Sequence, residues 1–144
     1  MIQEHTVQQA TSIEQIQSCY PVMKQLRPDL EEKLFVAQVQ RQISEGYQLV
    51  YLEVDGVVRA CAGFRILEFL AWGKVLYIDD LVTDSAIRKN GLASFLLNWV
   101  FGQAKEAKCN QVHLDSGPQR HEAHRLYLNH GFTIIGYHFA NEVS

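Results

Sequence analysis

Several features that define special classes of protein are scarce or absent in this sequence. It contains three cysteines, an odd number with no Cys-x-x-Cys pair, which favours reduced thiols over a disulfide framework. No apolar run approaches the roughly 18 residues of a membrane span, and the first residues lack the basic and apolar regions of a signal peptide. We therefore expect a cytoplasmic protein without a membrane partner.

The sequence also lacks the excess of basic residues that nucleic-acid-binding proteins carry. It has 13 Lys and Arg against 16 Asp and Glu, a net charge of −3, so we expect no nucleic-acid partner. With 144 residues, 47% of them hydrophobic, the chain is long enough to bury its own core as one domain. We predict a single domain over residues 1–144.

Metal-binding patterns are missing too. In His121-Glu122-Ala123-His124 the histidines stand three residues apart, whereas a zinc protease helix needs them four apart. No spacing places a third ligand beside His113 and Asp115, which would share one side of a strand. We expect no metal.

Hydrophobic periodicity and turn residues predict ten secondary-structure elements. Asp55-Gly56 is typical of a two-residue hairpin turn, and Gly46 and Gly131 each follow a helical pattern. The elements are a strand ending at Val7–Ala10, helices over 11–26 and 30–43, strands over 47–54, 57–69 and 75–83, a helix over 91–108, a strand over 112–115, a helix over 120–130 and a strand over 132–139. The order β-α-α-β-β-β-α-β-α-β predicts an α+β fold (α/β by some schemes), with a mixed, mostly antiparallel sheet flanked by helices.

The segment from Leu81 to Ser94 carries the strongest sign of a bound ligand. A strand ends, a short polar loop follows, and a helix begins at Gly91, which lets a bulky ligand approach the backbone. The first amides of a helix lack partners inside it and carry about half a positive charge. With Arg88 and Lys89 at the rim, the segment suits a pyrophosphate. An ordinary strand-to-helix turn is the alternative, because neither a Walker loop nor a G-x-G-x-x-G turn is present.

Two motifs resemble those of the GNAT superfamily of acetyltransferases. Arg88-Lys89-Asn90-Gly91-Leu92-Ala93 resembles the signature Arg/Gln-x-x-Gly-x-Gly/Ala, and Leu81-x-Thr83 before it resembles the family's strand end, where Val more often stands in place of Thr83. The second motif, Ala-x-x-Leu-Tyr-x-x-x-Gly-Phe, is matched by Ala123-His124-Arg125-Leu126-Tyr127-Leu128-Asn129-His130-Gly131-Phe132. Many members carry Asn where this chain has Arg120. The resemblance covers essentially the whole chain, with both motifs in the family's order.

This resemblance implies an N-acetyltransferase in which a primary amine attacks acetyl-coenzyme A directly, within a ternary complex and without a metal. The pantetheine arm would lie beside Leu81, Val82 and Thr83. The pyrophosphate would lie on the segment made of Arg88, Lys89, Asn90, Gly91, Leu92, Ala93 and Ser94. The alternative is a regulatory module of the same fold that binds an acyl-coenzyme A without turning it over.

Three residues are candidates for the proton transfers. Tyr127 matches the family's tyrosine that protonates the leaving thiolate, with packing beside Leu126 as the alternative. A phenol pKa of about 10 lies close enough to a thiol pKa of about 8.5 for this role. Asp79 or Asp80 would take the proton of the amine, or form a salt bridge instead. On a regular strand the two carboxylates point to opposite faces, so we expect at most one to face the cleft.

The acceptor is a small-molecule or protein amine that the sequence does not identify, and a homodimer is left open. Four carboxylates near the predicted cleft would favour a cationic acceptor. They are Asp79, Asp80, Asp84 and Asp115.

Overall fold

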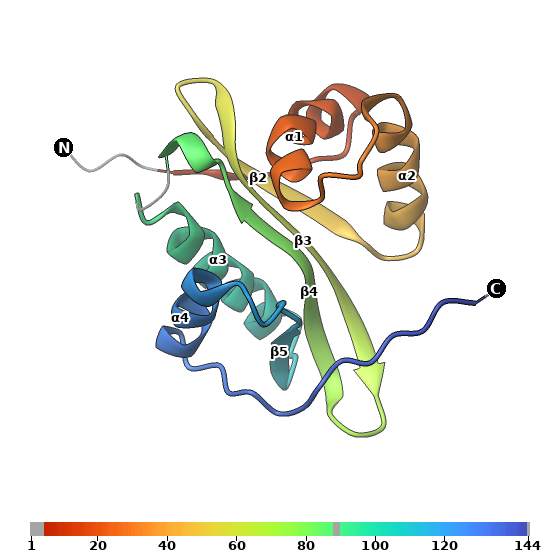
Figure 1. The fold of residues 1–144 in the computed structure, drawn as a ribbon, viewed down its shortest axis with the longest axis vertical. Coiled ribbons are helices and arrows are strands. Elements are labelled where there is room, and N and C mark those ends of the chain that lie inside the picture. Colours follow the sequence, from red (N-terminus) through yellow and green to blue (C-terminus); the bar gives the residue numbers. More distant parts are fainter. Residues whose placement is uncertain (1–4, 88–89, 144) are drawn as a thin grey trace. The chain divides into compact units, whose positions relative to one another are not determined.

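A computed structural model describes residues 5–87 and 90–143 of the chain. Its elements, labelled in Figure 1, are β1 (Val7–Gln9), α1 (Ile13–Leu26), α2 (Glu32–Ser44), β2 (Gln48–Val54), β3 (Val57–Phe69), β4 (Gly73–Thr83), a short 3-10 helix (Ser85–Ile87), α3 (Leu92–Glu106), β5 (Gln111–Leu114) and α4 (His121–Asn129). The chain divides into two compact units, Met1–His113 and Leu114–Ser144.

The five strands form one sheet in the order β1-β2-β3-β4-β5. The first three pairings are antiparallel, and the predicted α+β fold with a mixed, mostly antiparallel sheet is confirmed. The β2–β3 hairpin turns at Asp55 and Gly56, whose φ angles of 53° and 79° are both positive. Such a turn matches the right-handed twist of the strands that it joins, which is why the Asp-Gly pair predicted it.

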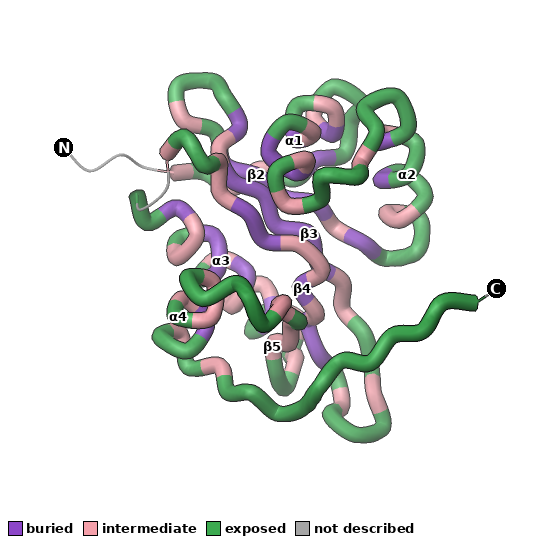
Figure 2. The backbone as a smooth tube through the Cα atoms, viewed as in Figure 1, coloured by how far each residue is buried: buried purple, intermediate pink, exposed green. Residues whose placement is uncertain are grey.

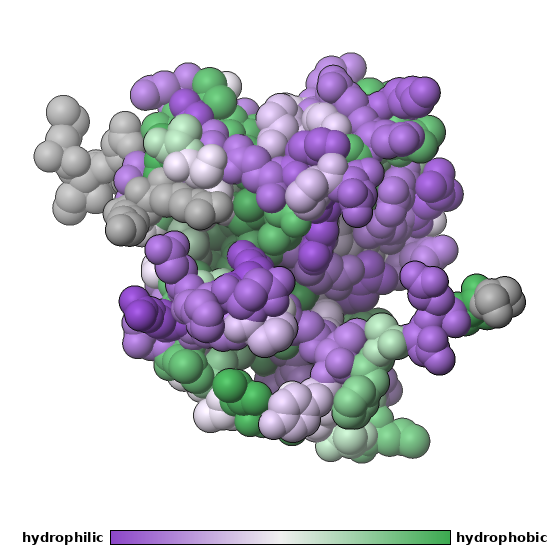
Figure 3. Space-filling view, in the orientation of Figure 1, coloured by the Kyte–Doolittle hydropathy of each residue, from purple (hydrophilic) through white to green (hydrophobic). Residues whose placement is uncertain are grey.

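The core of the first unit lies on both faces of the sheet. Helices α1 and α2 cover one face and α3 covers the other (Figure 1), and Figure 2 shows the buried residues gathered along the central strands. Ile16, Phe35 and Tyr47 are buried in the α1–α2 layer, whereas Phe64 meets Trp99 of α3 edge to face at 6.3 Å. The outer surface over α1 and α2 is largely hydrophilic (Figure 3). Within the described ranges, no helix is long and apolar enough to cross a membrane.

The second unit contains α4 and the segment that follows it. The predicted last strand over 132–139 is wrong, because those residues form no regular secondary structure. The side chains of Ile134, Tyr137 and Phe139 are 80%, 88% and 90% exposed. β-forming side chains alone do not make a strand, since a strand exists only where its backbone groups bond to a neighbour.

Candidate active site

A β-bulge in β4 sets the direction of the two candidate carboxylates. Across from β3, Asp80 pairs with Gly63 while Ile78 pairs with Phe64, so Asp79 is the extra residue. A bulge interrupts the alternation of side chains along a strand. Both carboxylates therefore find partners on the face that α1 and α2 cover, and the expectation of opposite faces does not hold here.

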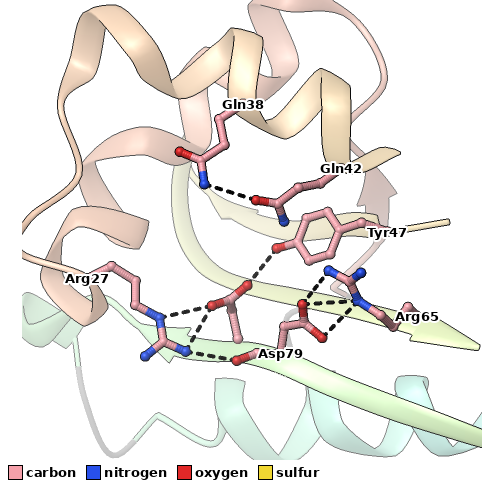
Figure 4. Close-up of polar contacts among 7 residues, drawn as sticks. Arg27, Gln38, Gln42, Tyr47, Arg65 and Asp79 are labelled. Atoms are coloured by element: carbon pink, nitrogen blue, oxygen red, sulfur yellow. Dashed lines mark hydrogen bonds and ion pairs between the residues drawn. The ribbon is translucent and has the colours of Figure 1, made fainter. Parts of the chain in front are cut away.

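Asp80 is held by the side chains of Tyr47 and Arg27, both of which Figure 4 labels. The Tyr47 hydroxyl donates to Asp80 Oδ2 at 2.7 Å. The Arg27 guanidinium, at the end of α1, donates to Oδ1 from Nε at 3.1 Å and pairs with it through Nη2 at 3.0 Å. The Asp80 side chain is only 13% exposed, so its charge is stabilised by hydrogen bonds on both oxygens rather than by water.

Tyr47 is the buried centre of this arrangement. Burial, followed by the charge of Asp80, raises the pKa of the Tyr47 phenol well above its usual value, so Tyr47 stays protonated and donates. Its hydroxyl occupies the place where a Cβ on Gly63 would stand. Glycine at position 63 is therefore what lets the Tyr47 hydroxyl reach Asp80.

Asp79 forms a separate ion pair with Arg65. The guanidinium donates to both carboxylate oxygens, with Nη2 to Oδ2 at 2.6 Å and Nε to Oδ1 at 3.2 Å, and it lies 5.4 Å from the centre of the Tyr47 ring. Arg27 Nη2 also donates to the Asp79 carbonyl at 2.9 Å. We call these five residues the carboxylate cluster: Arg27, Tyr47, Arg65, Asp79 and Asp80.

The end of β4 leads into the candidate cofactor loop. Leu81 and Val82 are buried, and the buried Thr83 hydroxyl has no hydrogen-bond partner among the described residues. Asp84 then anchors the loop: it accepts from the Ala86 amide at 3.0 Å and from Arg59 Nη1 at 2.6 Å. The Ala86 bond, with help from Gln25 and Arg59, lowers the pKa of Asp84 to about 2.

Helix α3 begins at Gly91, in the left-handed region with φ 77° and without a side-chain cap. A Cβ at Gly91 would meet no atom of the described residues within 4 Å, so these residues leave the space beside the backbone open. The first intrahelical bond runs from the Phe95 amide to the Gly91 carbonyl at 2.9 Å. The amides of Leu92 and Ala93 come before it and therefore have no acceptor inside the helix. Asn90 is exposed beside them and Ser94 lies in the first turn, while Arg88 and Lys89 lie outside the described residues.

Tyr127 belongs to the second unit, where it is the buried residue of α4. Its ring meets Phe132 edge to face at 5.8 Å. Burial raises the pKa of the Tyr127 phenol above its usual value, and the charge and hydrogen bonding of Arg120 offset part of that rise. The phenol is therefore protonated at neutral pH and available as a donor.

The four carboxylates expected to attract a cationic acceptor already have partners. Asp79, Asp80 and Asp84 each pair with an arginine, and Asp115 lies 3.4 Å from the His138 ring. The arginines offset the charges of Asp79, Asp80 and Asp84, which weakens the electrostatic argument for a cationic acceptor.

Sequence reasoning missed four members of this site, namely Arg27, Tyr47, Gly63 and Arg65. Gly63 is the one with a readable signal, since a glycine inside a predicted strand often marks a bulge or a close approach of another group. The other three come from different elements and meet only in the folded chain.

Comparisons with known proteins identify the family of this chain. The sequence model described as acetyltransferase (GNAT) family matches residues 11–132. An uncharacterized N-acetyltransferase, YhdJ of Bacillus subtilis (strain 168), is 34% identical over 139 residues, which cover 95% of this chain and 98% of that protein. The chain belongs to the acetyltransferase (GNAT) family and is an N-acetyltransferase.

Solved structures share the fold at low sequence identity. Aminoglycoside N-acetyltransferase AAC(6')-Iy in complex with CoA superposes with a TM-score of 0.84 at 15% identity, covering 97% of this chain and 95% of that one. Ribosomal-protein-alanine N-acetyltransferase from Brucella melitensis biovar Abortus 2308 gives a TM-score of 0.83 at 12% identity, covering 98% and 100%. These likenesses show the fold.

Proposed function

We propose that this enzyme transfers an acetyl group from acetyl-coenzyme A to a primary amine of a small-molecule or protein acceptor, by direct attack in a ternary complex. The observation that carries the proposal is the start of α3. Its first amides have no side-chain cap, Gly91 leaves open space beside them, and a helix start of this kind binds phosphate groups. A structural neighbour of the same fold is a complex with CoA.

The cofactor would lie along the end of β4 and the start of α3. Its pyrophosphate would accept from the amides of Leu92 and Ala93, with Arg88, Lys89, Asn90 and Ser94 around it. Its pantetheine arm would run beside Leu81, Val82 and Thr83, where the unpartnered Thr83 hydroxyl offers a hydrogen bond. Under this proposal the two units together form one acetyltransferase domain. The family match over residues 11–132 supports this, because the matched range includes residues of both units.

Two residues would move the protons. Asp80 is the better candidate base. The side chain of its partner Arg27 is 51% exposed, so an acceptor that reaches this arginine lies next to Asp80. Asp79 also binds an arginine through both oxygens, but the side chain of that partner, Arg65, is only 25% exposed. Tyr127 would donate to the thiolate as charge develops on sulfur.

The experiment is a thiol-release assay with acetyl-coenzyme A against a panel of primary amines. We expect release above the rate of spontaneous hydrolysis with at least one amine, and a raised melting temperature with coenzyme A, since a ligand of the native state stabilises it by about 2.7 kcal/mol at a hundredfold excess over Kd. A raised melting temperature without any turnover would instead identify a regulatory acyl-coenzyme A-binding module. Neither effect at millimolar acetyl-coenzyme A would refute the cofactor assignment.

A further inference from the structure

We infer that the acceptor is an amine that carries a carboxylate a few bonds away, as a free amino acid does, and that Arg27 binds this carboxylate. The inference rests on the proposed function and narrows its acceptor.

Arg27 is the exposed member of the carboxylate cluster. Its side chain is 51% exposed, whereas those of Asp80, Asp79 and Arg65 are 13%, 25% and 25% exposed. Nε and Nη2 bond to the Asp80 carboxylate and the Asp79 carbonyl. The third nitrogen, Nη1, makes no such bond within residues 5–87 and 90–143 and keeps two N–H donors for another group (Figure 4).

The charges of the carboxylate cluster cancel. Arg27 and Arg65 offset Asp80 and Asp79, and Tyr47 stays neutral because burial raises its pKa. An amine with only a positive charge would meet the guanidinium first and would gain no free carboxylate there. An amino acid instead presents a carboxylate to Nη1 and forms a charge-assisted bond of the geometry that arginine favours.

The same arrangement favours the reactive form of the amine. With the carboxylate on Arg27, the amine lies toward the neighbouring Asp80, which can accept its proton. Transfer of that proton to Asp80 leaves the neutral amine that attacks the thioester.

The test compares matched acceptors in the thiol-release assay. Each set contains an amino acid, its amide and its decarboxylated amine, with aminoethyl phosphate added to separate carboxylate from phosphate recognition. A charge-assisted bond predicts kcat/KM for the amino acid about 10- to 100-fold above that for the amine and the amide. Two exposed acidic residues, Asp29 and Glu31, follow Arg27 in the chain and would attract a cation. The assay can therefore give the opposite result, a higher kcat/KM for the decarboxylated amine.

Three variants connect the preference to Arg27. The measured quantity is kcat/KM for the amino acid divided by kcat/KM for its decarboxylated amine. In Arg27→Gln this ratio should fall to about one. In Arg27→Lys it should stay above one, because the positive charge remains. If the substitution also changes how Asp80 accepts the proton, kcat/KM for both acceptors changes by the same factor and the ratio stays the same. Circular dichroism checks that the variant is folded. Arg41→Gln, an exposed arginine of α2 outside the carboxylate cluster, is the control that should leave the ratio unchanged.

Turnover without discrimination, a preference for the decarboxylated amine or the phosphate, or a ratio that survives Arg27→Gln would each overturn the inference while the acetyltransferase assignment stands. No turnover with any acceptor would overturn both.

Discussion

Replacing Gly63 with alanine should destabilise the protein through Tyr47. A Cβ at position 63 would overlap the Tyr47 hydroxyl and the end of its ring. Tyr47 is 3% exposed and lies under the Arg65 guanidinium, so the ring cannot simply rotate into solvent. To make room it must give up its 2.7 Å bond to Asp80.

The magnitude follows from three contributions. A hydrogen bond to a charged group contributes about 1.5–3 kcal/mol, and crowding a packed core costs about 1–3 kcal/mol. Gly63 does not have a positive φ, so alanine fits the backbone and returns about 0.4–1 kcal/mol through the unfolded chain. We expect a net loss of roughly 2–5 kcal/mol in the free energy of unfolding.

Urea denaturation of a double-mutant cycle measures this loss. In a Tyr47→Leu background the obstructing ring end is absent, so Gly63→Ala should cost close to nothing. Gly102→Ala in α3 is the matched control, because a Cβ there meets no atom within 4 Å in the described part of the chain, and it should be neutral or stabilising. An equal cost of Gly63→Ala in both backgrounds would refute the proposed contact with Tyr47.

Three further outcomes test the cofactor loop and the acid. Tyr127→Phe should lower kcat by about a hundredfold or more while the Kd for coenzyme A changes little; near-wild-type turnover across the pH range would leave Tyr127 a packing residue. Gly91→Val should lose coenzyme A affinity in a thermal-shift titration, because φ 77° disfavours a β-branched residue and its side chain would fill the open space; a native circular dichroism spectrum with unchanged affinity would place the pyrophosphate elsewhere. The folded pKa of Asp84, about 2, lies below its ordinary value, so its stabilisation is complete above pH ~4 and is lost as the pH falls toward 2. The difference in unfolding free energy between wild type and Asp84→Asn should shrink over that range, and a constant difference would contradict the assignment.

Local sequence determined most of the architecture of this protein. Turn residues such as Asp55-Gly56 and the periodicity of apolar residues predicted nine of the ten elements within a few residues, because a turn or an amphipathic helix depends on neighbours in the chain. The motif around Gly91 and the segment at Tyr127 were also readable, and the family that they indicated is confirmed.

Tertiary structure alone decided how the carboxylates are used. The bulge at Asp79 turns both acids to one face, and Asp80 is bound by Arg27 and Tyr47, which lie 53 and 33 residues away in the sequence. The segment over 132–139 has β-forming residues but no paired strand. In each case the outcome depends on which distant backbone or side chain comes within hydrogen-bond distance, and local sequence patterns do not identify that partner.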